Sequence, residues 1–375
     1  MLEARAVDIT IASGEPPAIR GALEKLLDQD QSPSHIFTTS ESYATIVRIK
    51  ANIPALESVP VIPPPSHTWP TFLKTDNLLN VANQIAVMAI VAVGMTMVII
   101  TAGIDLSVGS LIALSTVVTA WLVRRYGGVD ASTAVLIAAS LGGMAVCACF
   151  GGFSGLMITR FDLPPFIATL AIMLVARGFA YIISEGRPIY EFPDRFTWLG
   201  RGSIGFGIPA AVALMGLIYA LAWVVMSRTR LGRHIYAVGG NPESARLSGI
   251  PNRRVLMFVY TATGALAGLG GVVMASQLKG GAGTYAPMYE LYIIASVVVG
   301  GTSLSGGQGR ILNTLIGAFI IAVIQNGMNL TNVESYTQNV VLGFVILGAV
   351  LLDGLKRKGF GMRWFRRAQE TYSKQ

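Results

Sequence analysis

The chain has 375 residues, of which 53% are hydrophobic and only 13% are charged, and its formal net charge is +8. Ordinary globular domains carry about 25% charged residues, so this composition argues against a soluble globular protein and favours one that lies in a membrane. The positive charge fits basic residues beside membrane spans, and no stripe of aromatic and basic residues indicates nucleic-acid binding. The 2 cysteines and 3 histidines are not spaced as metal ligands, so we expect no metal and no cofactor in this chain.

The first 75 residues are polar and differ from everything that follows. They contain an amphipathic segment near 18–27 and end in a proline-rich linker at 60–65. They are too polar to cross a bilayer, and residues 1–30 lack the apolar core of a cleavable signal peptide. A small soluble domain and a disordered tail are both open, and the order of helix, residues 34–39 and helix faintly resembles the end of a sugar-binding α/β fold.

Nine apolar segments follow, each close to the roughly 20 residues that cross a bilayer as a helix. Regular alternation of polar and apolar residues is absent, which excludes barrel strands. We therefore predict an all-α polytopic bundle, with a polar extension at 1–75, a transmembrane domain at 76–355 and a basic tail at 356–375. The seventh segment is short for a full crossing and is expected to be partly re-entrant. The predicted spans are 82–101, 106–123, 132–158, 164–184, 208–226, 254–276, 289–303, 311–330 and 336–353.

Basic residues predict the orientation of the bundle. They gather in the loop after the fifth span and in the tail after the ninth, so both are expected in the cytoplasm. Alternation then places Asp105 and residues 301–310 on the cytoplasmic side, and residues 1–75 outside.

Two glycine motifs separate neighbouring apolar segments, and we expect each to form a turn on the cytoplasmic side. In the first, Asp105 is a lone carboxylate between two uncharged runs, and we expect it to cap the next helix. The alternative is a gate or a water-exposed polar group. The similar spacing of the two motifs indicates an internal repeat. Their turn residues are Gly103, Asp105, Ser107 and Gly109 in the first motif, and Gly301, Ser305 and Gly307 in the second.

The longest polar stretch between spans predicts a short helix outside the bilayer. Asn241 is a suitable N-cap, Pro242 a suitable first residue and Glu243 an acid in the first turn, while Gly249 ends the helix. Such a helix is either a plain interfacial element or a surface that a cytoplasmic partner grips. Its candidate residues are Gly240, Asn241, Pro242, Glu243, Ala245, Leu247 and Gly249.

Three polar residues inside apolar segments are candidates for the translocation pathway. Arg177 either lines the pathway, pairs with an acid or extends to a nearby interface. Asn326 and Asn329 suit sugar hydroxyls or hydrogen bonds between helices.

Residues 72–355 resemble the permease subunit of bacterial ABC sugar importers of the ribose type. The resemblance implies a homodimeric, non-enzymatic core in the bacterial cytoplasmic membrane, which moves a monosaccharide such as a pentose. It also implies two cytoplasmic ATPase partners, an extracytoplasmic sugar-binding protein, and the 240–249 helix as the element that docks on the ATPase. The motifs that carry it are Asp76-Asn-Leu-Leu-Asn-Val, Ala92-Val-Gly-Met-Thr-Met-Val-Ile, Gly103-Ile-Asp-Leu-Ser-Val-Gly-Ser, Pro165-Phe-Ile-Ala-Thr-Leu, Thr229-Arg-Leu-Gly-Arg, Gly239-Gly-Asn, Arg246-Leu-Ser-Gly-Ile, Gly300-Gly-Thr-Ser-Leu-Ser-Gly-Gly and Asn326-Gly-Met-Asn-Leu.

Two features depart from the simplest form of this resemblance. Members of the family usually have ten spans, and the polar segment before Asp76 stands where the first is expected. Leu304-Ser-Gly-Gly-Gln308 spells the signature pentapeptide of the ATPases themselves, but the chain has no Gly-Lys dipeptide and hence no phosphate-binding loop. We therefore treat the pentapeptide as a coincidence.

Two other classes of function are weighed against the importer. An ion-coupled secondary sugar transporter would need intramembrane acids, for which only Asp105 and Glu290 are candidates. A sensor would bind its ligand with residues 1–75 and relay the signal through the spans.

Overall fold

The protein is represented by a computed structural model, which describes residues 10–12, 16–29, 31–39, 42–63 and 71–357. It divides into two compact units, Met1–Pro70 and Thr71–Gln375, which are taken separately below. Pro64 and Pro65 of the predicted linker, and the predicted basic tail from residue 358 onward, lie outside the described residues.

The first unit contains a small helix–strand–helix–strand arrangement. Strands β1 (Ile36–Phe37) and β2 (Val61–Ile62) pair in parallel, and helix α2 (Tyr43–Ala51) and the 3₁₀ turn η1 (Pro54–Leu56) connect them. Parallel strands need such a crossover, which explains why a helix lies between two segments that pair. Helix α1 (Pro16–Asp28) adds Leu23 to a core formed mainly by isoleucine, leucine and valine.

The second unit is a helical bundle, and the seven helices long and apolar enough to cross a membrane all belong to it among the described residues. They are α3 (Thr75–Ile100), α4 (Val108–Arg125), α5 (Thr133–Arg160), α6 (Pro165–Ile183), α8 (Ala210–Arg228), α11 (Asn252–Leu278) and α13 (Ile311–Leu330). Helix α14 (Ser335–Arg357) has a described apolar run at Ser335–Leu351, and the shorter helices are α7 (Trp198–Arg201), α9 (Arg230–Gly240), α10 (Pro242–Leu247) and α12 (Tyr289–Val299). The remaining elements are η2 (Thr71–Leu73), η3 (Gly128–Asp130), η4 (Asp194–Thr197), η5 (Gly205–Gly207) and the antiparallel strands β3 (Ser203–Ile204) and β4 (Ile208–Pro209).

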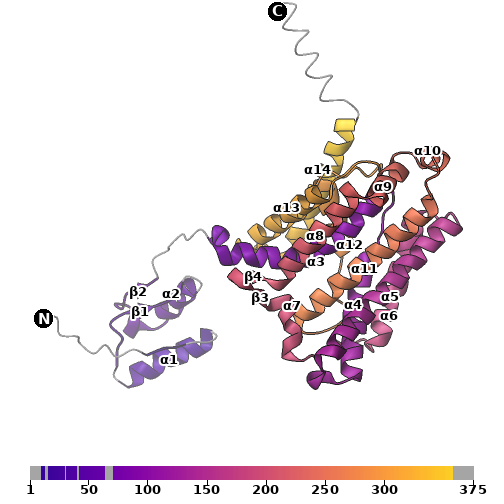
Figure 1. Cartoon of the computed structure of the whole chain (residues 1–375). Coiled ribbons are helices and arrows are strands. Elements are labelled where there is room, and N and C mark those ends of the chain that lie inside the picture. The colour runs from indigo at the N-terminus through magenta and orange to yellow at the C-terminus, as the bar shows by residue number, and fades with distance from the viewer. Residues whose placement is uncertain (1–9, 13–15, 30, 40–41, 64–70, 358–375) are drawn as a thin grey trace, which may run out of the picture. The chain divides into compact units, whose positions relative to one another are not determined.

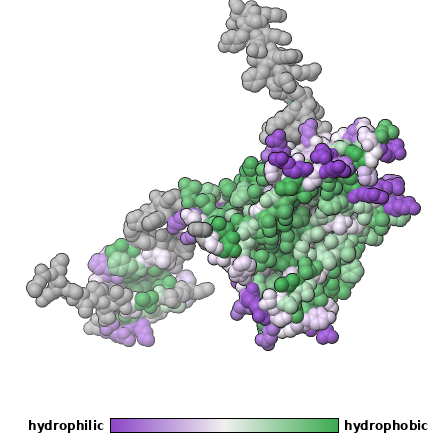
Figure 2. All heavy atoms as spheres, in the orientation of Figure 1, coloured by the Kyte–Doolittle hydropathy of each residue, from purple (hydrophilic) through white to green (hydrophobic). Residues whose placement is uncertain are grey.

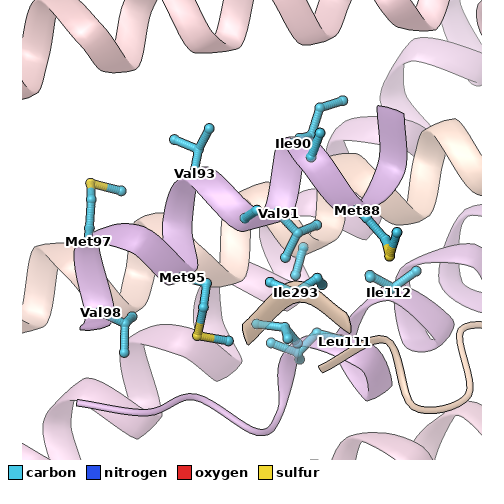
Figure 3. Packing of buried hydrophobic residues seen from close by; sticks show 14 of the residues in the cluster. Met88, Ile90, Val91, Val93, Met95, Met97, Val98, Leu111, Ile112 and Ile293 are labelled. Carbon is cyan, nitrogen blue, oxygen red and sulfur yellow. The ribbon is translucent and has the colours of Figure 1, made fainter. Parts of the chain in front are cut away.

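Helix α3 lies at the centre of the bundle, because its sequence is apolar on every face. It has no charged residue after Asp76, and its side chains are buried from Ile85 to Ile100. Val91 of α3, Leu111 of α4 and Ile293 of α12 belong to one core cluster and gather in one place (Figure 3). A helix that is hydrophobic all round is expected inside a bundle rather than on its surface.

Small residues allow α5 and α11 to cross closely. A Cβ atom added at Gly151 would lie 2.3 Å from the Tyr260 carbonyl oxygen, and one at Gly264 would lie 2.3 Å from the Cys147 carbonyl oxygen. Neither position has room for a side chain, so the backbones themselves are in contact, as in membrane helix pairs with small residues at four-residue spacing.

The predicted fold class is confirmed: the chain is an all-α polytopic membrane protein. All nine predicted spans coincide with helices, but the seventh is not a full crossing, because α12 has 11 residues and is only about 16 Å long. On the face shown in Figure 2, hydrophobic residues form a band between two hydrophilic ends. One end carries α9 and α10 and is called the α10 end; the other carries α7 and is called the α7 end (Figure 1).

Candidate functional site

Helix α10 projects from the α10 end as a capped, exposed helix between α9 and α11. The Asn241 side-chain oxygen accepts a hydrogen bond from the Ser244 backbone N–H at 2.9 Å, and Glu243 pairs with Arg246 at 2.6 Å. The hydrogen bond from Arg246 holds the pKa of the Glu243 carboxyl below its usual value. Leu247, the last residue of α10, is 78% exposed, so the helix presents an apolar side chain to a partner that binds at this end.

The ends of α10 are fixed to the bundle by backbone geometry. Pro242 begins the helix, and its carbonyl oxygen accepts a hydrogen bond from the Asn252 side chain at 2.7 Å. Ala245 is buried underneath, and Gly249 has a φ of +81°, a conformation that favours glycine and ends the helix. Helix α10 is therefore held at both ends while its outer face stays open.

Immediately before α10, three backbone segments meet, and we call this contact the glycine junction. It consists of Ile100 at the end of α3, Gly239–Gly240 at the end of α9 and Gly306–Gly307 between α12 and α13. The Gly307 N–H donates a hydrogen bond to the Ile100 carbonyl oxygen at 2.8 Å. A Cβ atom at Gly239 would lie 1.7 Å from that oxygen and 2.8 Å from the Gly307 nitrogen. The junction thus joins the base of α10 to the loop that follows α12.

The first glycine motif enters the bundle as an extended segment between α3 and α4. Asp105 and Ser107 are fully buried, and one Asp105 carboxylate oxygen accepts bonds from the Ser107 N–H and hydroxyl at 2.9 and 2.6 Å. Thr169 of α6 holds the same segment by bonding to Ile104 and Leu106. The other Asp105 oxygen and the nearby Tyr260 hydroxyl are buried without a partner among the described residues.

The second glycine motif has a different environment. Gly301, Ser305 and Gln308 are exposed at the α10 end, and Gly301, Gly306 and Gly307 have positive φ. Another segment enters the bundle in the way that the first motif does. It connects Leu278 of α11 to Tyr289 of α12 and is buried from Gly280 to Gly283. Residues 304–308, which resemble the ATPase signature, form part of this turn rather than a soluble helix.

Two intramembrane charges, Arg177 and Glu290, lie where α12 begins. Arg177 of α6 donates hydrogen bonds to the carbonyl oxygens of Gly283 and Tyr285 at 2.7 and 2.8 Å. A Cβ atom at Gly109, in the first turn of α4, would lie 2.1 Å from a Glu290 carboxylate oxygen. Glu290 therefore lies in the first turn of its own helix and beside the first turn of another, where the positive helix ends stabilise an acid.

Asn326 and Asn329 of α13 bond to neighbouring helices. The Asn326 amide exchanges two hydrogen bonds with the Asn77 amide of α3, at 3.0 and 3.1 Å. The Asn329 side-chain oxygen accepts a bond from Gln338 of α14 at 2.9 Å. A pathway role for Arg177, Asn326 and Asn329 stays a prediction.

Sequence reasoning missed the glycine junction and the contact between Glu290 and Gly109. The repeated Gly-Gly pairs at 239–240 and 306–307 were a signal for the first, because adjacent glycines permit close backbone approach. The second had no local signal, since Gly109 and Glu290 are far apart in the chain.

Comparisons with known proteins agree with this architecture. The family described as branched-chain amino acid transport system / permease component matches residues 77–350. The ribose import permease of Escherichia coli K12 is 44% identical over 292 residues, which are 77% of this chain and 88% of that protein. The D-allose transport permease of the same organism is 40% identical over 288 residues, 76% of this chain and 86% of that protein.

A more distant relative extends the range of sugars. The galactose/methyl galactoside import permease of Haemophilus influenzae is 33% identical over 308 residues, 76% of this chain and 89% of that protein. No solved structure matches the chain. The predicted resemblance is confirmed, because the matched region contains the bundle, the glycine junction and α10 alike. The chain belongs to this family of transport-system permease components, together with the ribose, allose and galactose import permeases.

Proposed function

We propose that the chain is the membrane-spanning subunit of an ATP-binding-cassette importer that moves a monosaccharide, a ribose-like pentose or a related sugar, across the cytoplasmic membrane. The relatives' printed substrates, ribose, allose and galactose, support a monosaccharide. In this proposal two copies form the pathway, two separate ATPase subunits supply the energy, and an extracytoplasmic binding protein delivers the sugar. The α10 end and the C-terminus face the cytoplasm.

The observation that carries the proposal is the connection from α10 to the interior of the bundle. Helix α10 has an exposed outer face, and the glycine junction ties its base to the end of α3 and to the loop after α12. The end of α3 continues into the extended segment that contains Asp105, and the loop after α12 follows a helix of only 11 residues. A displacement of α10 by a partner would therefore be transmitted directly to these two segments.

The exposed side chain of Leu247 offers a direct test. Leu247→Asp places a charge on the proposed docking face, and it is expected to abolish co-purification with the ATPase subunit and sugar uptake. Tyr126→Asp is the matched control, because Tyr126 is 64% exposed and follows α4. Unchanged ATPase binding and uptake in Leu247→Asp would refute α10 as the docking element.

One observation favours a second candidate, an ion-coupled sugar transporter. Asp105 and Glu290 each keep one buried carboxylate oxygen without a hydrogen-bond partner in the described part of the chain. Buried intramembrane acids are typical of ion and proton sites. Sugar uptake into vesicles that lack the ATPase, driven by a sodium or proton gradient, would favour this candidate over the importer.

A further inference from the structure

A cavity of about 490 Å³ opens at the α10 end, and its lining residues include none of α10 and none of the glycine junction. It lies between the last turns of α8, helix α9 and the first turn of α13, and Arg310 and Asn313 line it together with Trp223 and Leu312. The Tyr236 hydroxyl donates a hydrogen bond to the Gly309 carbonyl oxygen at 2.8 Å and fixes one wall. Its volume is within the range of small-molecule sites.

The charges at this cavity are positive. Arg310 is exposed in the cavity wall, and none of the described carboxylates lies within ion-pairing distance of it. Arg228 stacks over the Trp223 ring, with its guanidinium carbon 5.5 Å from the ring centre, which keeps a second cation at the rim. In the first turn of α13 the N–H groups of Asn313 and Thr314 donate to the Arg310 carbonyl oxygen, which leaves those of Ile311 and Leu312 for an occupant. An occupant should therefore be an anion.

Apolar stripes run from the cavity into the hydrophobic band. On α8 the exposed side chains are Leu217, Leu221 and Val224, and on α13 they are Leu312, Ile316 and Ile320. Both sets repeat at helical spacing, so each forms one continuous stripe on the outside of its helix. An occupant that fills the cavity with an anionic group and covers these stripes must also carry long apolar chains.

We propose that this cavity is a binding site for the headgroup of an anionic phospholipid, with its acyl chains along α8 and α13. The phosphate would meet Arg310 and the first turn of α13, and Trp223 would lie at the level of the headgroups, where amphipathic aromatic rings are enriched. Basic pockets between membrane helices are a recurrent form of lipid recognition. The proposal does not depend on the transported substrate or on the ATPase.

Native mass spectrometry of the full-length chain in detergent, with phosphatidylglycerol or phosphatidylcholine added, tests the site. The protein is expected to retain phosphatidylglycerol in preference, and Arg310→Gln to weaken this binding about fivefold or more. Arg310→Lys should keep most of it, which shows that the fold is intact. Arg253→Gln is the matched control, since Arg253 is an exposed arginine in the first turn of α11, outside the cavity, and its effect should stay below about twofold.

Three results would overturn the proposal. Equal losses in Arg310→Gln and Arg253→Gln would mean diffuse attraction to the basic surface, and displacement of the lipid by equimolar inorganic phosphate would mean a site for the free anion. A disulfide between two copies of a Cys149→Ser/Leu312→Cys variant in native membranes would place a second copy over the cavity instead of lipid. Absence of this disulfide, with lipid binding lost on Trp223→Ala, is the result that the lipid site predicts.

Discussion

Substitution of Gly239 by alanine is the sharpest perturbation of the glycine junction. The added methyl group would lie 1.7 Å from the Ile100 carbonyl oxygen. Carbon–oxygen contacts settle at about 3.3 Å, so Ile100 and α9 must separate by about 1.6 Å. This breaks the 2.8 Å hydrogen bond from the Gly307 N–H to the same oxygen. Loss of the hydrogen bond costs about 0.5–1.5 kcal/mol and overpacking about 1–3 kcal/mol, or about 1.5–4.5 kcal/mol together.

The neighbouring residue supplies the control. Gly240 has no atom within 4 Å of an added Cβ and no positive φ, so Gly240→Ala should leave the junction intact. Thermal unfolding and ATP-driven sugar uptake are measured for both variants in the assembled transporter. Gly239→Ala is expected to lower both the unfolding temperature and uptake, and Gly240→Ala neither. Equal behaviour of the two variants would refute the close contact at Gly239 and its role in coupling.

Three further predictions concern caps, helix pairing and pH. Asn241→Ala removes the cap of α10 and should destabilise that helix by about 0.5–2 kcal/mol, seen as faster hydrogen exchange confined to α10; unchanged exchange would contradict it. In a double-mutant cycle, Asn77→Ala and Asn326→Ala should couple by about 0.6–1.7 kcal/mol in unfolding, whereas a changed KM for sugar with no coupling would instead support a pathway role. Lys279 donates a hydrogen bond to Asp194 and holds the pKa of the Asp194 carboxyl below its usual value. The stabilisation by this pair is therefore complete above the usual pKa of the carboxyl and is lost as the pH falls through the lowered pKa. Unfolding temperatures measured from about pH 7 to about pH 3 should show this loss of stability in the unsubstituted protein and not in Lys279→Met. An identical loss in both proteins would count against the pair.

The long helices could be predicted from the sequence, because a membrane span requires an uninterrupted apolar run of sufficient length. The sequences of α3 and α5 both contain such a run. The cap at Asn241 was equally local, since a cap is formed by residues three positions apart. The position of Asp105 was harder to predict. We expected this lone acid to cap the next helix, but the N-cap of α4 is Ser107, from which the Asp105 carboxylate accepts hydrogen bonds. The burial of the segment depends on Thr169 and Tyr260, which lie on other helices.

The internal repeat inferred from the two glycine motifs stays a prediction. The spacing of glycine and serine linked residues 103–109 with residues 301–307. The first group is mostly buried, whereas in the second Gly301 and Ser305 are exposed and Thr302 and Ser303 are buried. Burial depends on which helices surround a turn, and glycine spacing carries no information on that. The contact between Gly109 and Glu290 could not be predicted for the same reason, because it forms only where the beginnings of α4 and α12 meet inside the bundle.

The most direct test of the importer is sugar uptake by proteoliposomes that contain the chain, its ATPase partner and a sugar-binding protein. The predicted result is uptake that requires ATP on the side of the membrane where the ATPase lies, that persists when all ion gradients are collapsed, and that stops in Leu247→Asp. Uptake that follows an imposed ion gradient without ATP would contradict the account.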